Sequence, residues 1–357
     1  MSKLLDIASL QRDFMLDAPT ALVVYLSDDA QLSVRYVPQD ERLQRVAKQL
    51  EGKSLQRACV ALGAFDGVHV GHRRLLDACV RQANDMGALS VACTFNPDPD
   101  VVVSAHPASK ITTTRDRIHL LASSGVDVVV VVEFTPAVAT LSHEEFFEGL
   151  LGRYFDIAAI HVGENFRMGS RGVCDVSCLA AWGAQRSIEV VGHALARYKG
   201  APISSSRIRG ELEVGNLEDA HAMLGRHFCM SGCVESGRGY GHEVGIPTAN
   251  VDLDEALVNC SDGVYGCVVL VDGWVYPAAT NVGVPPTFAH ESHLSKLEPH
   301  LLGFDENIYG KYISVAFIER YRDPVVFRND AHLIEVIGAD IARTEQLFGA
   351  FGVCLSA

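Results

Sequence analysis

The run VDVVVVVEF, residues 126–134, constrains the fold most, because an extended strand of this composition is apolar on both faces. Such a strand needs cover on both sides, as in a parallel sheet between two layers of helices. Short apolar runs alternate with helical patterns from Arg57 to Ala196. The alternation predicts an open α/β domain, which binds its ligands beyond the carboxyl ends of its strands.

The same alternation gives the expected elements of this domain. A helix begins near residue 70, with Leu76, Cys79, Val80 and Ala83 on one face. Two further helices are expected around RDRIHLLASSG and HEEFFEGLLGRYF. The remaining expected strands are CVALGAF (59–65), LSVACTF (89–95), IAAIHVG (157–163) and IEVVGHAL (188–195).

After the helical stretch NLEDAHAMLGR the pattern becomes β-rich, with strands expected at 227–236, 248–253, 264–280 and 311–321. The pair Asp272-Gly273 between VVLV and WVYP is typical of a tight hairpin. These features predict an antiparallel barrel or sandwich closed by a helix at 330–351, on which Leu333, Val336, Ile337 and Ile341 share one side.

Three regions follow: 1–55, whose role the sequence leaves open; an α/β domain at 56–222; and a β domain at 223–357. The first region fits neither pattern, although TALVVYLS and LSVRYVP favour an extra hairpin.

Composition excludes several classes of protein. The 357 residues carry a net charge of −14, which argues against general affinity for nucleic acid. No apolar run reaches the ~20 residues of a membrane span, and the N-terminus is too acidic for a signal peptide. We therefore expect a cytoplasmic protein whose partners are small molecules, with a homo-oligomer left open. In a cytosolic chain of this size, most of the ten cysteines are expected to be reduced core residues. The Cys174/Cys178 and Cys229/Cys233 pairs lack nearby partners with zinc spacing, which argues against a metal or redox role for them.

The stretch GAFDGVHVGHRRLL, residues 63–76, places His69 and His72 where the first expected strand becomes a helix. Unpaired N–H groups and the helix dipole favour a phosphate there, and Gly67 and Gly71 let the backbone approach it. Two imidazoles can donate hydrogen bonds to a phosphorus centre as charge moves to the leaving group. The plainer alternative is one histidine capping the helix and the other in solvent.

GAFDGVHVGH resembles the nucleotide-binding signature of the adenylyltransferase half of bacterial bifunctional riboflavin kinase/FAD synthetases. TFNPDP (94–99) is similar to the family segment T-F-D-P-H-P, VGENFRMG (162–169) to its flavin-binding loop, and ISSSRIR (203–209) to its Ser-Ser-Thr-Arg-Ile-Arg segment, which is mobile and reaches the ATP triphosphate. The resemblance implies a Rossmann-like nucleotidyltransferase domain. It assigns catalysis to His69, His72 and Arg207, ATP binding to Gly63, Ala64, Phe65, Asp66, Gly71, Ser205 and Ser206, and flavin binding to Asn96, Asp98, Asn165 and Arg167.

In the second half, GRGYGHEVGIPTANV (237–251) joins a glycine-rich turn to Pro-Thr-Ala-Asn. Its chemistry suits a loop over phosphates, with hydroxyl and amide oxygens for Mg²⁺, although a glycine-rich hairpin without a ligand is equally compatible. The motif resembles the hallmark of riboflavin kinases, which implies ATP binding by Gly237, Gly239, Gly241 and Pro247, and Mg²⁺ and ATP binding by Thr248 and Asn250. Glu298 in KLEPHLLGF falls where that family has its catalytic glutamate, the base for the ribityl 5′-hydroxyl.

The resemblance covers residues 57–345 and has departures. His242 and Pro285 stand where the family commonly has arginine, and Asn96 and Asp98 replace Asp and His. If Asp98 faces the phosphates, it replaces a potential donor with an anion.

The sequence therefore predicts a two-domain enzyme that phosphorylates riboflavin to FMN with Mg-ATP and adenylylates FMN to FAD, releasing pyrophosphate. One alternative is a riboflavin kinase with a degenerate adenylyltransferase domain, which the changes at Asn96 and Asp98 favour. The other is a non-catalytic flavin-binding regulator, against which the intact Thr248, Asn250 and Glu298 argue.

Overall fold

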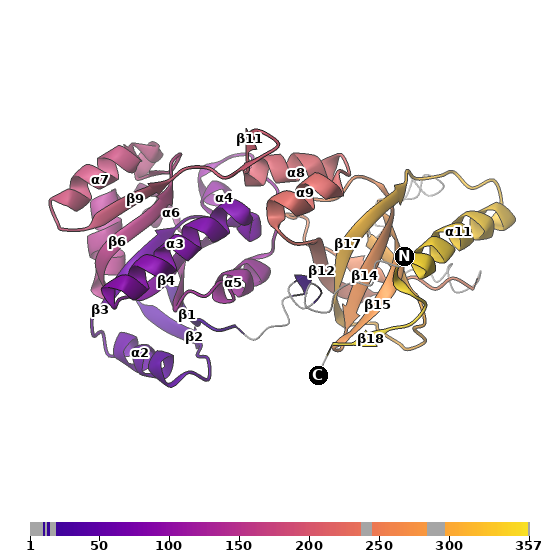
Figure 1. Cartoon of the computed structure of the whole chain (residues 1–357), viewed down its shortest axis with the longest axis horizontal. Helices are drawn as coiled ribbons and strands as arrows, with labels where there is room; N and C mark the ends of the chain where they lie inside the picture. Colours follow the sequence, from indigo (N-terminus) through magenta and orange to yellow (C-terminus); the bar gives the residue numbers. More distant parts are fainter. Residues whose placement is uncertain (1–9, 11–12, 15–18, 237–244, 284–296, 356–357) are drawn as a thin grey trace. The chain divides into compact units, whose positions relative to one another are not determined.

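The computed structural model describes residues 10, 13–14, 19–236, 245–283 and 297–355 (Figure 1). The chain forms two compact units, one of Asp17–Ser205 and one of Ser206–Ala357 together with Met1–Leu16. Each unit has its own sheet, and each is described by itself below.

The first unit is built on a seven-stranded sheet in which every neighbouring pair is parallel except the edge pair β1/β2. Val128 to Val132 in β5 have no exposed surface, which confirms that this strand is covered on both faces. In sheet order the strands are β2 (Leu32–Tyr36), β1 (Leu22–Leu26), β5 (Val128–Glu133), β4 (Leu89–Asn96), β3 (Gln56–Leu62), β6 (Phe155–Gly163) and β9 (Glu189–His193).

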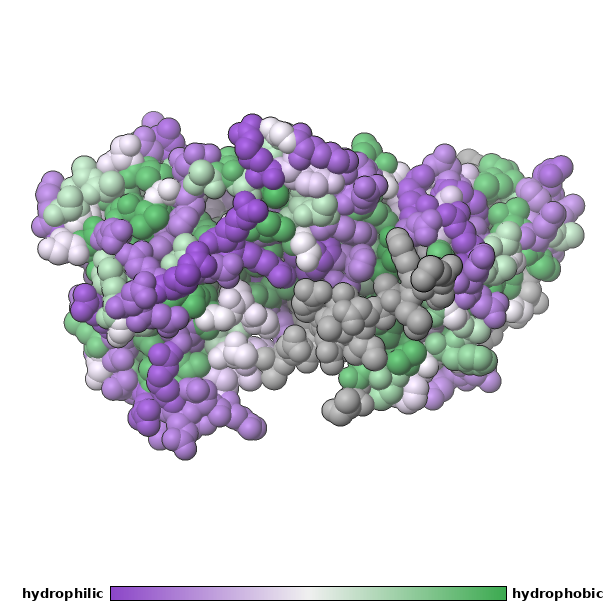
Figure 2. All heavy atoms as spheres, viewed as in Figure 1, coloured by the Kyte–Doolittle hydropathy of each residue, from purple (hydrophilic) through white to green (hydrophobic). Residues whose placement is uncertain are grey.

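The hairpin expected near the N-terminus is confirmed, since β1 and β2 pair antiparallel. β1 also pairs in parallel with β5, so residues 22–36 extend the main sheet. The next helix, α2 (Glu41–Glu51), buries Leu43, Val46, Ala47 and Leu50, while hydrophilic side chains cover its outer face (Figure 2).

Helix α3 (Val70–Met86) lies between β3 and β4 in the chain, and the short α4 (Pro99–Val103) and α5 (Thr114–Ala122) lie between β4 and β5. The short α6 (Pro136–Thr140) follows β5, and α7 (Val176–Ala184) precedes β9. The helix expected at 143–155 is present but irregular, because Glu145–Leu150 forms a π-helical turn and Leu151–Arg153 a 3₁₀ turn. This winding buries the adjacent rings of Phe146 and Phe147, the second of which stacks on Trp182 at 5.5 Å.

The second unit is an antiparallel barrel. Its strands, in sheet order, are β13 (Asn250–Asp252), β12 (Phe228–Glu235), β17 (Tyr312–Arg322), β14 (Gly263–Val271), β15 (Trp274–Val282) and β16 (Leu297–Leu301), with β18 (Val353–Cys354) beside β15. The two ends of this order meet, because the Ala249 N–H donates to the Pro299 carbonyl at 2.9 Å. This seam resolves the choice between barrel and sandwich in favour of a nearly closed barrel.

The tight hairpin predicted at Asp272-Gly273 is confirmed. Asp272 and Gly273 both have positive φ, 48° and 81°, and link β14 to β15 in a two-residue turn. The last helix, α11 (Asp330–Phe348), ends earlier than expected, before Gly349 with φ 91°. Leu333 on this helix is buried, and Val336, Ile337 and Ile341 are partly buried on the same side.

Two helices, α8 (Ser205–Glu213) and α9 (Leu217–Leu224), precede the barrel. Asp13, from the N-terminal stretch, is buried against the start of the barrel, where its carboxylate accepts from the His227 backbone N–H at 3.0 Å. Across the described residues, no helix is both long and apolar enough to cross a membrane.

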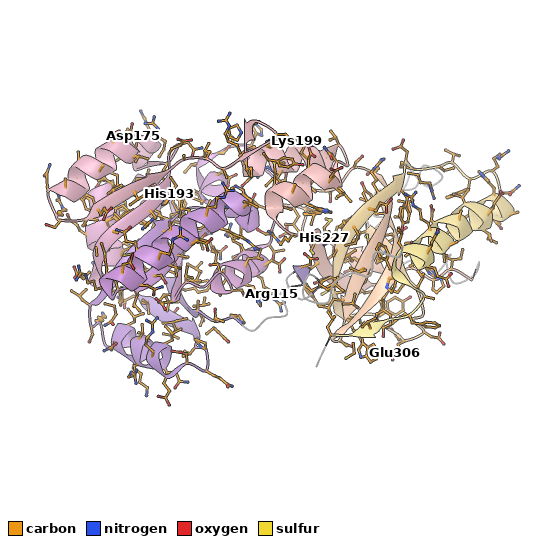
Figure 3. All side chains as sticks on the ribbon, viewed as in Figure 1. Arg115, Asp175, His193, Lys199, His227 and Glu306 are labelled. Atoms are coloured by element: carbon orange, nitrogen blue, oxygen red, sulfur yellow. A yellow bond between two sulfur atoms is a disulfide. The ribbon has the colours of Figure 1, made fainter. Side chains whose placement is uncertain are left out.

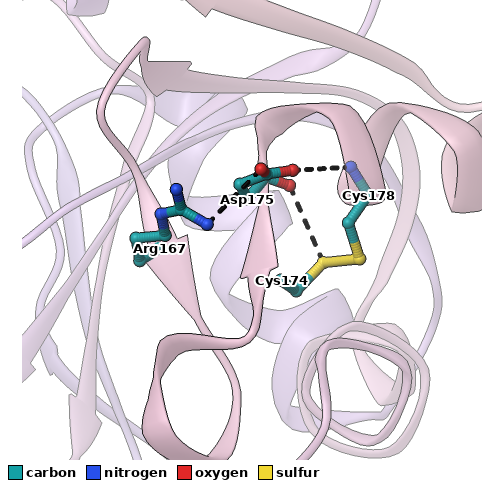
Figure 4. The surroundings of a disulfide bond; sticks show 4 residues. All are labelled: Arg167, Cys174, Asp175 and Cys178. Carbon is teal, nitrogen blue, oxygen red and sulfur yellow. Dashed lines mark hydrogen bonds and ion pairs between the residues drawn. A yellow bond between two sulfur atoms is a disulfide. The ribbon is translucent and has the colours of Figure 1, made fainter.

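Most of the cysteines are reduced, as expected, but Cys174 and Cys178 form a disulfide (Figure 4). The other eight cysteines are free thiols, five of them buried. The pair comes together because strand β8 (Cys174–Asp175) runs directly into the first turn of α7.

Candidate active sites

The first candidate site lies at the carboxyl edge of the parallel sheet, where β3, β4 and β6 end. The Gly63 N–H donates to the Cys93 carbonyl at 3.1 Å, and the Thr94 hydroxyl donates to the Ala64 carbonyl at 3.0 Å. The first loop therefore lies directly beside the end of β4, which leads into the second motif. GAFDGVHVGH and TFNPDP, which lie about thirty residues apart in the sequence, are therefore neighbours in space.

The loop after β3 turns sharply before α3 begins. Strand β3 ends at Leu62, earlier than expected, because Phe65 and Gly67 both take positive φ values, 55° and 76°. Asp66 is buried, and its Oδ1 accepts from the backbone N–H groups of Ile111 and Thr112 at 2.9 and 3.3 Å. The Asp66 carboxylate thus holds the loop to the segment that precedes α5.

His69 is the N-cap of α3, so the plainer expectation of a capping histidine is correct for this residue. Its Nδ1 accepts from the His72 backbone N–H at 3.2 Å, which leaves Nε2 as the protonated nitrogen of the neutral ring. The two imidazoles stack with centroids 3.6 Å apart. A Cβ on Gly71 would lie 3.1 Å from His69 Cε1, so glycine is the residue that gives the ring this space.

His72 has a different environment from His69. Its Nδ1 is buried without a hydrogen-bond partner in the part of the chain that the structure describes. Burial, and next the nearby charge of His69, hold the pKa of His72 well below its usual value. His72 is therefore a neutral imidazole near pH 7, and its ring meets the edge of Phe65 at 5.2 Å.

The ISSSRIR segment begins at the same loop. The Ser205 hydroxyl donates to the Asp66 carbonyl at 2.9 Å. From Ser205 the chain is helical, and Ser206 and Arg207 lie in the first turn of α8, where the second unit begins.

The carboxylate of Asp98 is paired with two cations. Asp98 accepts from Arg117 Nη1, and Lys110 Nζ lies 3.5 Å from its other oxygen. Asp98 and Arg117 are both buried, and Arg117 also donates to the Phe95 carbonyl at 2.6 Å. Sequence reasoning missed both cations. Their only signal in the sequence is position, since Lys110 lies just before α5 and Arg117 lies within it. The anion at position 98 is thus compensated within the protein.

The candidate flavin residues lie at the ends of β4 and β6, which flank β3. Asn96 ends β4, and its Oδ1 accepts from the Thr114 hydroxyl at 3.3 Å. Asn165 is exposed in the turn between β6 and β7 (Arg167–Met168). Arg167 is exposed too, with Nη1 3.4 Å from Asp175 Oδ2. Strand β9 ends close by at His193, labelled in Figure 3, which hydrogen-bonds the buried His161 ring at 2.9 Å.

The second candidate site lies on the barrel seam. Neighbouring strands are antiparallel throughout the order from β13 to β16, so these two end strands run in opposite directions. The hydrogen bond from Ala249 to Pro299 places these two residues opposite each other. In an antiparallel pair, the next residue on one strand lies opposite the preceding residue on the other. Asn250 is therefore beside Glu298.

The side chains at the seam alternate between two faces. Ala249 and Pro299 are buried, whereas Thr248 is exposed and Asn250 and Glu298 are half-buried on the opposite face. The seam thus brings together three of the predicted kinase residues. Sequence reasoning missed Asn281, directly opposite Glu298 on β15, and Glu235, opposite Asn250 on β12, because only the strand register reveals them.

Several predicted positions lie outside the described residues: Gly237, Gly239, Gly241, His242 and Pro285. Pro247 is described, and its carbonyl lies 2.7 Å from His300 Nδ1, a second contact across the seam.

Comparison with known proteins gives two family matches, one over most of the α/β unit and one over the barrel. The FAD synthetase family profile matches residues 51–207, and the riboflavin kinase profile matches residues 224–348. The two candidate sites fall inside these two ranges.

Curated relatives match across both units. Proteins described as bifunctional riboflavin kinase/FMN adenylyltransferase are similar to this chain in Pseudomonas fluorescens (31% identity, 82% of this chain, 93% of the relative) and Escherichia coli K12 (31%, 82% and 94%). The Bacillus subtilis protein of the same description is 30% identical over 82% of this chain and 93% of its own. A solved structure described as a macrolide-efflux protein of Streptococcus pneumoniae has a TM-score of 0.73 at 28% identity, covering 81% of this chain and 94% of that one.

Proposed function

The chain belongs to the family of bifunctional riboflavin kinases/FMN adenylyltransferases, and from this premise we propose which residues carry its two reactions. It is a transferase that converts riboflavin to FMN and FMN to FAD, with ATP as the second substrate of each step. The observation that carries the residue assignment is the barrel seam, which places Asn250 beside Glu298.

In the kinase reaction, Glu298 accepts the proton of the ribityl 5′-hydroxyl as that oxygen attacks the γ-phosphorus of ATP. The bond to the β-phosphate oxygen breaks, and ADP leaves. Asn281, opposite Glu298, is a polar neighbour on the same face that can orient the carboxylate or the hydroxyl.

The residues at the seam fit a Mg²⁺ ion. Thr248 and Asn250 offer a hydroxyl and an amide oxygen, the neutral hard donors that suit a cation retaining several waters. When bound, Mg²⁺ supplies positive charge to the transferring phosphoryl group. Gly237, Gly239, Gly241 and Pro247 are proposed to line the phosphates on the strength of the family motif alone.

In the adenylyltransferase reaction, the FMN phosphate attacks the α-phosphorus of ATP, and pyrophosphate leaves. No protein nucleophile is needed, so the protein acts by orientation and charge stabilisation. His69 donates from Nε2, because its Nδ1 is occupied by the helix cap, and His72 donates as a neutral imidazole. The N-terminus of α3 adds its unpaired N–H groups.

The residues around this centre take supporting roles. Gly63, Ala64, Phe65, Asp66 and Gly71 shape the ATP loop, and Ser205, Ser206 and Arg207 are assigned to the phosphates on the strength of the family motif alone. Asn96, Asn165 and Arg167 contact the flavin at the ends of β4 and β6. Asp98 acts through Arg117, holding the end of β4 in place rather than touching phosphate. ATP as substrate and the charge of −14 support a cytoplasmic protein with small-molecule partners and no nucleic acid.

One assay separates this function from its alternatives. The protein is incubated with riboflavin, ATP and Mg²⁺, and flavins are separated by chromatography over time. We expect FMN to appear first and FAD to follow. FMN without FAD, both here and from supplied FMN, would leave a kinase with an inactive adenylyltransferase unit. Riboflavin recovered unchanged but bound to the protein would indicate a regulator.

A further inference from the structure

A cluster of one imidazole and two sulfurs lies where β8 meets α7. One ligand atom from each of His143, Cys174 and Cys178 lies within 4.8 Å of the other two. Cys174 is buried, and His143 and Cys178 are half-buried. The cluster involves none of the residues proposed for catalysis.

Several contacts fix these three side chains. The Asp175 carboxylate caps α7 by accepting from the Cys178 backbone N–H at 2.9 Å (Figure 4). The His143 ring meets the edge of Trp182, in the same helix, at 5.6 Å. The backbone of Gly169 also lies near His143, because a Cβ on Gly169 would be 4.0 Å from the backbone nitrogen of His143. The His143 imidazole therefore lies beside the two sulfurs although it comes from a segment about thirty residues away in the sequence.

The donor chemistry favours a soft or borderline divalent cation. Thiolate sulfur and imidazole nitrogen are the preferred ligands of Zn²⁺, and three protein ligands leave a fourth position for water.

The disulfide uses the same two sulfurs, so it and a metal exclude each other. Only three residues separate Cys174 from Cys178, and so short a loop removes little entropy from the unfolded chain. The disulfide is thus a weak device for stabilising the fold. A thiol reductant that supplies two electrons and two protons converts it to the dithiol.

We propose that the reduced chain binds one Zn²⁺ ion through Cys174 Sγ, Cys178 Sγ and a ring nitrogen of His143. Two thiol protons are released as the two sulfur–zinc bonds form, and no electrons are transferred in this step. The ion would tie the segment before Glu145 to the hairpin that carries Arg167.

The test uses the full chain, reduced with a phosphine and freed of metal. Titration with Co²⁺, a spectroscopic substitute for Zn²⁺, should give one equivalent bound with a thiolate-to-cobalt charge-transfer band, and Zn²⁺ should displace it. The double variant Cys174→Ser/Cys178→Ser should lose the band, and His143→Gln should weaken Zn²⁺ binding about tenfold or more.

The chain contains a matched control with the same spacing. Cys229 and Cys233 lie four residues apart along strand β12, about 13 Å, too far to share an ion. Cys229→Ser/Cys233→Ser should therefore keep the cobalt band.

A second measurement needs no variant: Zn²⁺ should slow alkylation of Cys174 and Cys178 by iodoacetamide but leave exposed Cys233 unaffected. Reduced parent protein that binds cobalt without the charge-transfer band, or equal alkylation with and without Zn²⁺, would overturn the proposal.

Discussion

Asp98 and Arg117 form a buried ion pair at the end of β4, one oxygen of the carboxylate accepting from Arg117 Nη1. Arg117 also donates to the Phe95 carbonyl, so the pair fastens the start of α5 to the strand that carries the TFNPDP motif. A substitution that looked unfavourable for phosphate binding is therefore satisfied by a partner nineteen residues later in the chain.

Replacing Asp98 should destabilise the α/β unit and should not accelerate FAD synthesis. Asp98→Asn and Asp98→His both leave Arg117 buried without its anion, at a cost of about 3–5 kcal/mol. The Trp274→Phe background leaves Trp182, buried in the α/β core, as the only tryptophan. Its fluorescence during urea unfolding then reports on this unit alone.

The control for this prediction is Asp100→Asn, at the more exposed partner of Lys110. It should cost about 1 kcal/mol or less, because Asp100 is partly exposed and Lys110 keeps its contact with Asp98. An Asp98→His protein that is as stable as the parent and forms FAD faster would show that Asp98 opposes the phosphates after all.

Glu298→Gln should slow FMN formation by about 10²–10⁴-fold, because the variant keeps the shape of the carboxylate and loses its basicity. Initial rates with saturating riboflavin and Mg-ATP measure the effect, and circular dichroism confirms folding. Glu319→Gln, on β17, serves as the control and should stay within about twofold of the parent. A Glu298→Gln protein with the parental rate would remove Glu298 from the mechanism.

Asn250→Asp should lower the Mg²⁺ concentration that half-saturates the kinase reaction, because a carboxylate binds the ion more strongly than an amide oxygen does. The shift should be about fivefold or more, while the KM for riboflavin changes less than about twofold. A normal Mg²⁺ titration combined with a raised riboflavin KM would place Asn250 at the flavin instead.

The sequence predicted what is encoded locally. The uniform valines of β5 required a covered sheet, and Asp272-Gly273 required a tight hairpin because both residues take positive φ readily. The order of motifs, from the loop at Gly63 to Glu298, identified both units and the family.

Long-range pairing was not accessible in the same way. The N-terminal hairpin was expected, but its local pattern does not specify that β1 pairs with β5. Nor does spacing along the chain bring His143 to Cys174, or Arg117 to Asp98. Each of these contacts forms only because the tertiary fold brings the end of one strand next to another strand or to the start of a helix.

Acidification should destabilise the α/β unit through His161. Burial, and next the charge of His193, lower the pKa of His161 to about 4, so the folded unit holds this ring neutral. In the unfolded chain the imidazole has its ordinary pKa near 6.5, so it takes up a proton as the pH falls below that value. The stabilisation is therefore complete above pH 6.5 and is lost toward pH 4. At about pH 5.5 the loss is about 1.4 kcal/mol.

Unfolding of the Trp274→Phe protein at about pH 7.5 and about pH 5.5 measures this dependence. His161→Gln should lose less stability between these two values than the parent does. His106→Gln, at an exposed position, should follow the parent. Parallel losses in the parent and His161→Gln would contradict the assignment.

His72→Ala should reduce FAD formation from FMN and ATP by about 10²-fold or more, since it removes a donor to the charge that develops on the phosphates. The same protein should form FMN at the parental rate, because Glu298 belongs to the other unit. His72 donates as a neutral ring, its pKa lying well below the usual value, so its protonation state does not change between about pH 8 and about pH 6. FMN itself gains a proton on its phosphate near pH 6. The informative comparison is therefore the pH profile of the parent against that of His72→Gln, and the two should run parallel. A change in the rate of FAD formation near pH 6.5 that the parent shows and His72→Gln lacks would mean that His72 works as a cationic acid.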